Sequence, residues 1–281
     1  MSLERHIGSE PESLAGYARA IVLACDPAEK VELAKAAARA WHHRRLSIGR
    51  RVAGASMPAR PGRPDKPELR PPRDMPRRSA SGLRGRIALL HALAHIELNA
   101  VDMTWDLIGR FFDAAVPRSF FDDWVRVGVE EAKHFALLAR RLEALDAGYG
   151  DLPAHDGLWE TAQETGSDLL ARIAIVPLVL EARGLDITPS MIGKLQAAGD
   201  DESAQILSII YRDEKRHVAF GCKWFRYLCD REGREPEPTF HRLVRTHFRG
   251  RIKPPFNDRA RSEAGLTPGF YKPLAAIGHM P

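Results

Sequence analysis

The chain has 281 residues, which is enough for one large or two small domains with a sizeable hydrophobic core. Hydrophobic residues make up 44% of it and charged residues 28%, a composition that is typical of folded globular proteins and excludes wholesale disorder. No stretch approaches about 18 consecutive apolar residues, so we expect no membrane-spanning helix.

The charge of the chain is unevenly distributed. The net charge is +5, yet residues 43–87 hold 13 Lys and Arg against 3 Asp and Glu, and residues 241–260 hold 6 against 1. The rest of the chain therefore carries a net charge of −10. The alkaline pI of 9.2 belongs to two segments, and it is weak evidence for a nucleic-acid partner.

The sequence gives two indications of compartment. The first residues, MSLERHIGSEPES, are charged and lack the apolar core of a signal peptide. The three cysteines, Cys25, Cys222 and Cys229, are odd in number and show no zinc-type spacing, which favours reduced thiols in a core. We therefore expect a cytoplasmic protein.

Residues 1–49 are expected to form an N-terminal helical extension. Apolar residues recur at helical spacing over 11–24 and again over 27–41. Asp26 and Pro27 are the N-cap and first-turn residues typical of a helix start, so they predict that the second helix begins there.

Residues 50–84 are expected to form a basic, proline-rich arm. Seven prolines lie between residues 58 and 76, and proline fixes φ and lacks an N–H, so no continuous helix can cross this stretch. A solvated connector is the favoured interpretation of residues 50–79. Two alternatives stay open: contact with a nucleic acid or another anionic partner, or packing against an acidic face of the protein or of a second subunit.

Residues 85–232 carry the pattern of four long helices, predicted over 85–115, 118–147, 156–183 and 200–232. A short helix is expected to start at Pro189 and to end at Gly199. Strand signals are weak throughout, so the predicted fold class is all-α, with a four-helix bundle as its centre. The seven prolines of residues 233–281 predict an irregular C-terminal tail.

Each of the four long helices carries an acidic residue in a pattern that suits metal binding. Two helices carry an E-x-x-H pair, and this i, i+3 spacing places a carboxylate and an imidazole on one helix face. The candidate metal ligands are Glu97, Glu131, His134, Glu181, Glu214 and His217.

The spacing of these residues repeats. Glu97 precedes Glu131 by 34 residues and Glu181 precedes Glu214 by 33, so two similar halves would pack with approximate two-fold symmetry. Two divalent cations need several anionic oxygens to screen their repulsion, and four glutamates balance their charge. The pattern therefore predicts two metal ions, iron or manganese. The alternative is a helical bundle with buried salt bridges and no metal.

Other residues near the motifs receive weaker assignments. Asp213 lies four residues before His217 and is a candidate hydrogen-bond partner for it. His91 and His95 do not share the helix face of Glu97, so they are interpreted as ordinary surface or packing histidines. Tyr211 lies three residues before Glu214, and we consider a redox role for it as a minor alternative.

The chain resembles the ferritin-like superfamily over about residues 85–232. The resemblance rests on HALAHIELNAVD, on EEAKHFALLARRLEALDAGYGDLPAHDGLWE, on LVLEARGLD and on YRDEKRHVAFGCKWF. The phrases PAHDGLWE and EARGLDITP point more narrowly to an uncharacterised ferritin-like family known as a domain of unknown function. A more distant resemblance is to the di-iron hydroxylases that oxidise a modified adenosine in tRNA. The resemblance implies the same six ligands, each at its matching motif position, and names no substrate.

Three functions follow as hypotheses. The first is an O2-dependent di-iron oxidase or hydroxylase acting on an unknown small molecule. The second is an iron-handling or peroxide-scavenging module. The third is a tRNA-modifying hydroxylase that holds RNA on its basic segments. We expect a monomer or a small homo-oligomer, because the arm would hinder packing into a cage.

Overall fold

The computed structural model describes residues 11–50 and 56–277, and its regular elements are helical. The start of the predicted arm, residues 51–55, and the expected charged N-terminus lie outside the described residues. Within the described ranges there is no β-strand, only two isolated bridges. The elements are α1 (Leu14–Leu23), α2 (Pro27–His42), η1 (Pro72–Asp74), α3 (Leu83–Arg110), α4 (Arg118–Glu143), α5 (Gly157–Gln163), α6 (Leu169–Ile175), η2 (Val176–Glu181), α7 (Ala182–Ala197), α8 (Asp201–Arg231), α9 (Pro236–His247), α10 (Asp258–Glu263) and α11 (Pro268–Ile277).

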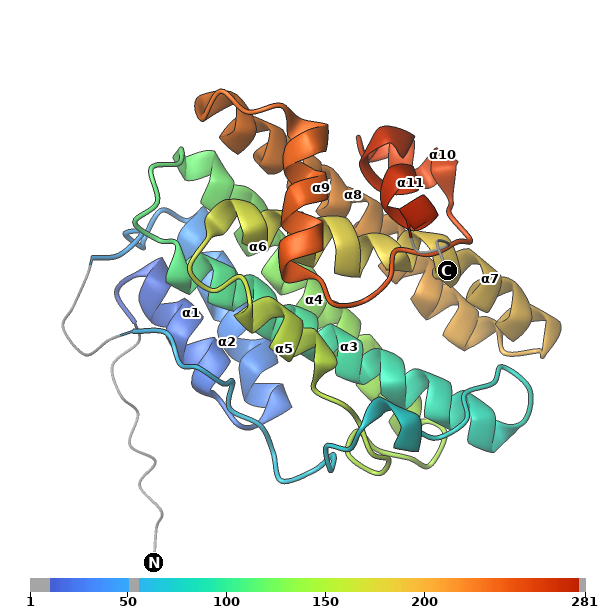
Figure 1. The fold of residues 1–281 in the computed structure, drawn as a ribbon. Helices are drawn as coiled ribbons and strands as arrows, with labels where there is room; N and C mark the ends of the chain where they lie inside the picture. The colour runs from blue at the N-terminus through green and yellow to red at the C-terminus, as the bar shows by residue number, and fades with distance from the viewer. Residues whose placement is uncertain (1–10, 51–55, 278–281) are drawn as a thin grey trace, which may run out of the picture.

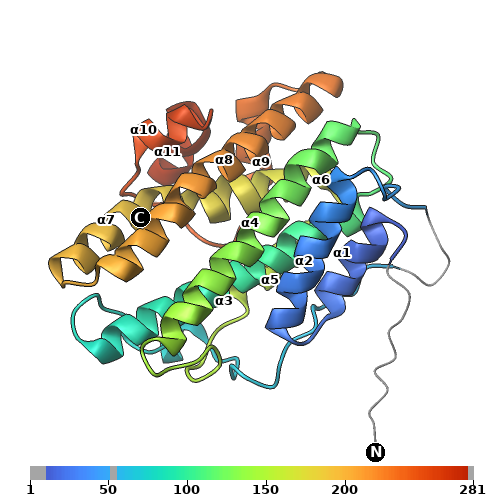
Figure 2. The same ribbon diagram turned by 180° about the vertical axis from the view of Figure 1, so that it is seen from behind.

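The helices pack in successive layers (Figure 1). The helices α1 and α2 form one pair, in which α1 lies against α3 and α2 against α4. The next pair is α3 and α4, and α4 in turn contacts α8, which packs with η2 and α7. Figure 2 shows α2, α4 and α8 side by side from behind. The helices α9, α10 and α11 cover the far side, where α9 contacts α6.

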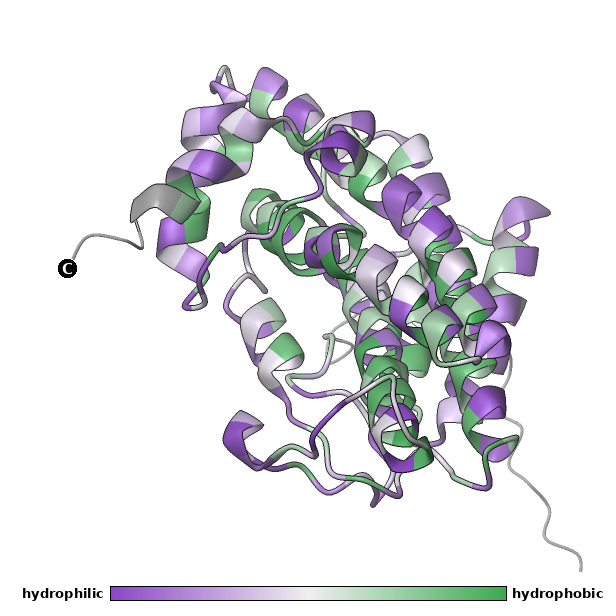
Figure 3. Cartoon of the chain, turned by 90° about the vertical axis from the view of Figure 1, so that its right-hand side faces the viewer, coloured by the Kyte–Doolittle hydropathy of each residue, from purple (hydrophilic) through white to green (hydrophobic). Residues whose placement is uncertain are grey.

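The core lies between these layers. Apolar residues gather on the faces where the helices meet, and polar residues face outward (Figure 3). All five tryptophans are buried in this core. Such a buried aromatic side chain contributes about 2–3 kcal/mol relative to an exposed one. No helix in the described part of the chain has both the length and the hydropathy needed to cross a membrane.

The prediction of a third long helix over 156–183 is wrong in two respects. The helix is interrupted after α5 by a turn containing Gly166, and Asp168 then caps α6 by accepting a hydrogen bond from Ala171 N at 3.0 Å. Beyond the π-helical segment η2 the chain stays helical through Gly184 and Pro189, where a break and a new start were expected. Packing against α8 outweighs the local preference of glycine and proline.

The helix α7 tolerates Pro189 because another group replaces the missing donor. Proline has no N–H, so the carbonyl of Leu185, four residues earlier, loses its helical partner. The side-chain amide of Asn257 donates to that carbonyl at 3.2 Å. A residue 72 positions away in sequence therefore completes the helix, and no local pattern could have predicted this contact.

Residues 68–74 of the arm are exposed, but residues 58–63 contact the helices. Gly62 N donates to the carbonyl of Val22 at 2.8 Å, and the Arg63 guanidinium forms an ion pair with the buried Asp102. The favoured prediction of a solvated connector is wrong for residues 58–63. Of the alternatives left open, packing against an acidic part of the protein is the one that the structure shows.

The prediction of an irregular C-terminal tail is also wrong. Residues 236–277 contain α9, α10 and α11, and Pro236 and Pro268 each stand at the start of a helix, where proline is well tolerated. The ring of Phe240 packs 5.9 Å from Phe225 of α8 and 5.4 Å from Phe270 of α11, measured between ring centroids. Two of the prolines in this region therefore mark helix starts.

Candidate metal centre

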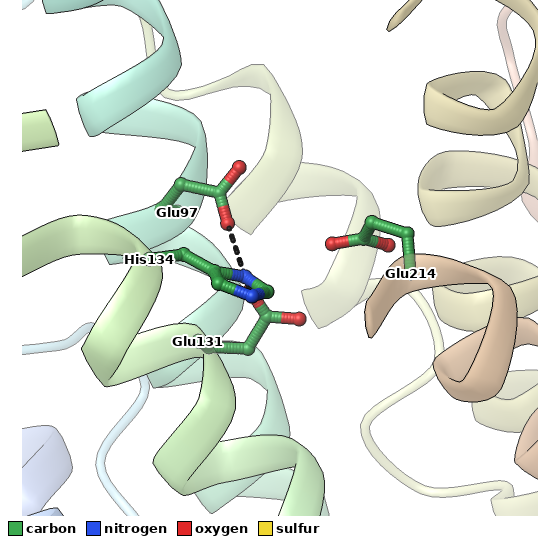
Figure 4. Close-up of side chains that lie close together, drawn as sticks. All are labelled: Glu97, Glu131, His134 and Glu214. Atoms are coloured by element: carbon green, nitrogen blue, oxygen red, sulfur yellow. Dashed lines mark hydrogen bonds and ion pairs between the residues drawn. The ribbon is translucent and has the colours of Figure 1, made fainter. Parts of the chain in front are cut away.

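The six predicted ligands come together between α3, α4, η2 and α8. One group consists of Glu97, Glu131, His134 and Glu214, and a second consists of Glu181, Glu214 and His217. Within each group the possible ligand atoms all lie within 4.8 Å of one another, and Glu214 belongs to both. Figure 4 shows the Glu214 carboxylate facing the other three members of the first group across the space between α8 and the α3–α4 pair.

The local helix geometry explains how each side chain reaches this point. On α4 and α8 the i, i+3 spacing presents the carboxylate and the imidazole of each E-x-x-H pair from one face. Glu181 ends the π-helical segment η2, and wide turns of this kind are frequent at functional sites. Gly221 lets α8 approach η2, because a Cβ there would lie 2.7 Å from Cβ of Pro177.

Glu131 occupies the centre of the cluster. One carboxylate oxygen, Oε1, lies 2.8 Å from Nδ1 of His217, and the other, Oε2, lies 3.4 Å from Nδ1 of His134. The centroids of the two imidazole rings are 5.9 Å apart. Both histidines thus turn the same nitrogen, Nδ1, toward one carboxylate.

The other nitrogen of each histidine meets a carboxylate from the opposite helix. His134 on α4 bonds through Nε2 to Asp213 of α8 at 3.2 Å, and His217 on α8 bonds through Nε2 to Glu130 of α4 at 2.9 Å. The expected pairing of Asp213 with His217 is wrong, since Asp213 serves the histidine of the other helix. Glu130 was not predicted. Such partners fix the tautomer and the orientation of a metal-binding imidazole.

These two outer carboxylates are themselves held by cations. Arg216 donates to Glu130 at 2.7 Å and to Asp213 at 3.0 Å, and thereby links the two helices. Lys133 also pairs with Asp213, and Arg126 lies 3.3 Å from Glu130. The pKa values of both carboxyls lie below their usual range, because their histidine and cationic partners outweigh the effect of burial.

The inner carboxylates have the opposite tendency. Burial raises the pKa of Glu97 to about 8, and burial together with the neighbouring carboxylates raises the pKa values of Glu181 and Glu214. Glu131 is the exception: burial disfavours its anion, but His217 and His134 outweigh burial and lower its pKa. Without a cation beside them, these three carboxyl groups therefore tend to keep their protons, and positive charge in the cluster would favour their ionised forms.

The donor atoms fit a pair of divalent cations. Both oxygens of Glu131, both oxygens of Glu181 and Oε2 of Glu214 are buried without a hydrogen-bond partner among the described residues. Nδ1 of His217 is in the same state, since its contact with Glu131 lacks hydrogen-bond geometry. A buried polar atom without a partner is costly, and a metal ion accepts the lone pairs that these atoms present.

Three other residues singled out in the sequence stay outside the cluster. His91 and His95 are buried, so they are packing residues and the surface interpretation is wrong. His95 bonds through Nδ1 to the hydroxyl of Tyr149 at 2.8 Å. The hydroxyl of Tyr211 accepts a hydrogen bond from the side chain of Asn257 at 3.1 Å, and Tyr211 is not among the residues of the metal-binding groups.

An apolar cavity adjoins the cluster on one side. Its volume is about 330 Å³, within the range of small-molecule sites, and Glu97, Glu181 and Glu214 form part of its wall. The two histidines and Glu131 do not line it. The cavity therefore reaches three of the four glutamates of the cluster.

Comparison with known proteins gives the relationship of the chain. Residues 23–272 match the family DUF455, which is described as a protein of unknown function. An uncharacterised protein of Haemophilus influenzae is 42% identical over 209 residues, which cover 73% of each chain. No solved structure matches the chain. Because the family match extends over most of the sequence, the chain belongs to the DUF455 family.

Proposed function

We propose that α3, α4, the continuous run α6–η2–α7 and α8 form a ferritin-like four-helix bundle that binds two iron ions. The convergence of the six side chains, with buried oxygens that have no other partner, carries this proposal. One glutamate from each of two helices and one E-x-x-H pair from each of the other two is the ligand set of ferritin-like di-iron and di-manganese proteins. Manganese suits the same donors.

We further propose that the activity is an O2-dependent oxidation or hydroxylation of an organic substrate. Two ferrous ions held by these six residues would supply the two electrons that O2 hydroxylation of a C–H bond requires beyond those of the bond itself, and an external two-electron donor would restore them after each turnover. Glu131, at the centre of the cluster, would be one of the residues that hold the cations. Asp213 and Glu130 would keep both imidazoles oriented, and the apolar wall beside Glu97 would exclude water.

The cavity favours an enzyme over an iron store. A store needs access for ions and water, whereas an apolar space of about 330 Å³ beside the ligands suits an organic molecule. Light scattering separates the two. A monomer or small oligomer is expected for the enzyme, and a cage of 12 or 24 chains would favour storage and overturn this part of the proposal.

The tRNA-modifying alternative receives less support. Three basic residues in and beside the arm pair with acidic groups of the protein itself: Arg60 with Asp156, Arg63 with Asp102, and Arg86 with Asp200. Their charge is therefore partly neutralised before any RNA arrives. Charge reversal at Arg44, Arg45, Arg50 and Arg51 should leave RNA binding at low salt unchanged, and a large loss would restore this alternative.

The direct test is metal content and oxidation. Protein loaded with Fe(II) without oxygen and then desalted should hold two ions per chain, and O2 should oxidise them rapidly. Glu131→Ala should hold less than one ion, because Glu131 contacts both histidines. Glu143→Ala, an exposed change on the same helix, is the matched control and should behave like the unsubstituted chain. No bound metal in the unsubstituted protein would overturn the proposal.

A further inference from the structure

The cavity beside the cluster has walls from separate parts of the chain. The helices α3, α7 and α8 form one side, and the segment 248–256, which follows α9, crosses the other. Most of the lining is aliphatic or aromatic, including Leu93, Met103, Ile187, Ile210 and Phe256. Such a lining binds the uncharged body of a ligand by removing apolar surface from water.

The two ends of the cavity are lined by different polar groups. The inner end is the wall of Glu97, Glu181 and Glu214, whose carboxylates are buried. The segment 248–256 contributes Arg251 and Lys253, both exposed to solvent at the outer end. An occupant would therefore be apolar where it lies deep and anionic where it emerges.

The ammonium group of Lys253 has a particular feature. It forms no ion pair or hydrogen bond within the part of the chain that the structure describes, although its own carbonyl accepts from Arg183 at 2.9 Å. Arg183 also donates to the carbonyl of Pro255 at 3.0 Å, so the backbone beside Lys253 is fixed to α7. A positioned cation without a partner beside an apolar cavity suits an anionic headgroup.

We propose that this cavity binds an apolar molecule with one anionic group, of the medium-chain organic acid class, with its apolar part directed toward Glu97, Glu181 and Glu214. The proposal deepens the function proposed above and rests on it for the oxidation that would follow binding. A carboxylate and a phosphate monoester share the required chemistry, so both headgroups belong in the test.

The probes are four ten-carbon compounds with one chain and different headgroups. Decanoate and decyl phosphate are anionic, 1-decanol is neutral, and decyltrimethylammonium is cationic. Binding is measured by calorimetry on protein loaded with Fe(II) without oxygen. At least one anionic compound should bind about fivefold or more tighter than decanol, as expected for a partly exposed ion pair, and the cation should bind more weakly still. The tighter anion identifies the headgroup.

Two substitutions test the placement of the chain and the headgroup. Gly184→Phe should abolish binding, because Gly184 lines the cavity and a Cβ there meets no atom within 4 Å, so the ring can extend into the open space. Gly193→Phe, also on α7 and equally open but outside the cavity, is the matched control. Lys253→Glu should weaken binding of the anionic compound about fivefold or more. Arg242→Glu, with the same charge change on α9, should leave this affinity unchanged.

The outcomes separate this proposal from the proposed function. If the protein binds two metal ions but decanol binds as well as both anions, or if Gly184→Phe binds as well as Gly193→Phe, the cavity proposal is overturned and the metal centre stands. If the protein binds no metal, the proposed function is overturned, and the titrations repeated on the metal-free protein decide which headgroup the cavity prefers.

Discussion

The two sides of the candidate metal centre are built differently. On the histidine side each imidazole is held by a carboxylate of the opposite helix, and Arg216 links those two carboxylates. On the cavity side both carboxylate oxygens of Glu181 have no partner among the described residues, and an apolar space lies beside them. Under the proposed function, the first side would hold metal in place and the second would leave coordination positions open to a substrate.

Metal removal tests whether cations bind between the two sides and stabilise the fold. Because a ligand that binds only the folded state stabilises it, Fe(II) at about 1,000 times its Kd should add about 4 kcal/mol and raise Tm by roughly 10 °C. Calorimetry with and without a chelator measures this rise. Glu131→Ala should show almost none of it, and an equal rise in both proteins would place the metal elsewhere.

Substitution of the outer carboxylates breaks the histidine side alone. Asp213→Asn and Glu130→Gln should each weaken metal affinity about 10- to 100-fold, because the imidazoles lose the charged partners that orient them. Competition with a chelator of known affinity measures the change. Asp230→Asn on α8 and Glu143→Gln on α4 are exposed controls. Unchanged affinity in Asp213→Asn would mean that the crossed hydrogen bonds do not support the site.

Release of segment 248–256 breaks the cavity side alone. Arg183→Gln removes the donors to the carbonyls of Lys253 and Pro255, which should favour local opening about fivefold for the loss of about 1 kcal/mol. Chymotrypsin, which does not cleave at arginine, should cut this segment correspondingly faster. Metal affinity should stay within about twofold. The control Arg259→Gln loses only an exposed pair with Glu263, and cleavage as fast as in Arg183→Gln would refute the assignment.

The smallest effect is expected away from both sides, at His91. Its Nε2 accepts the backbone N–H of Gly150 at 2.9 Å, and burial lowers its pKa. The unfolded chain therefore gains a proton first as the pH falls below about 6.5, so stability decreases toward acid. His91→Gln should lower the free energy of unfolding by about 1 kcal/mol at pH 7. Between pH 7 and pH 5 the variant should lose less stability than the unsubstituted chain. Urea unfolding at both pH values measures this, with the exposed His43→Gln as control.

The sequence contained enough to place the inner residues but not the outer ones. An E-x-x-H pair sets two side chains on one face through helix geometry alone. The placement of Glu131 and His134 could therefore be predicted without knowing which helices lie beside α4. Glu130 lies about 100° away from Glu131 around α4, so the helix spacing alone predicts that it points away from the site. Its role depends on where α8 lies, because it bonds a histidine 87 residues away.

The errors in the predicted fold also come from contacts between segments that are distant in sequence. Gly184 and Pro189 are local signals for a helix end, yet α7 passes both because Asn257 supplies the missing donor from a distant segment. The prolines of the C-terminal region read as breakers, yet Pro236 and Pro268 begin helices whose aromatic side chains pack on α8 and on one another. Glycine and proline do disfavour the interior of a helix, but tertiary contacts determined whether the helix ended at these residues.

The crossed pairing of α4 and α8 has a consequence for biosynthesis. A nascent chain that has released α3 and α4 from the ribosome presents Glu97, Glu131 and His134, but lacks Asp213, which supports His134. Under the proposed function, metal capture would therefore be completed only after α8 has emerged and packed. Newly made protein would pass through a folded or partly folded stage without its full complement of ions, and the supply of iron would then determine how much of it matures.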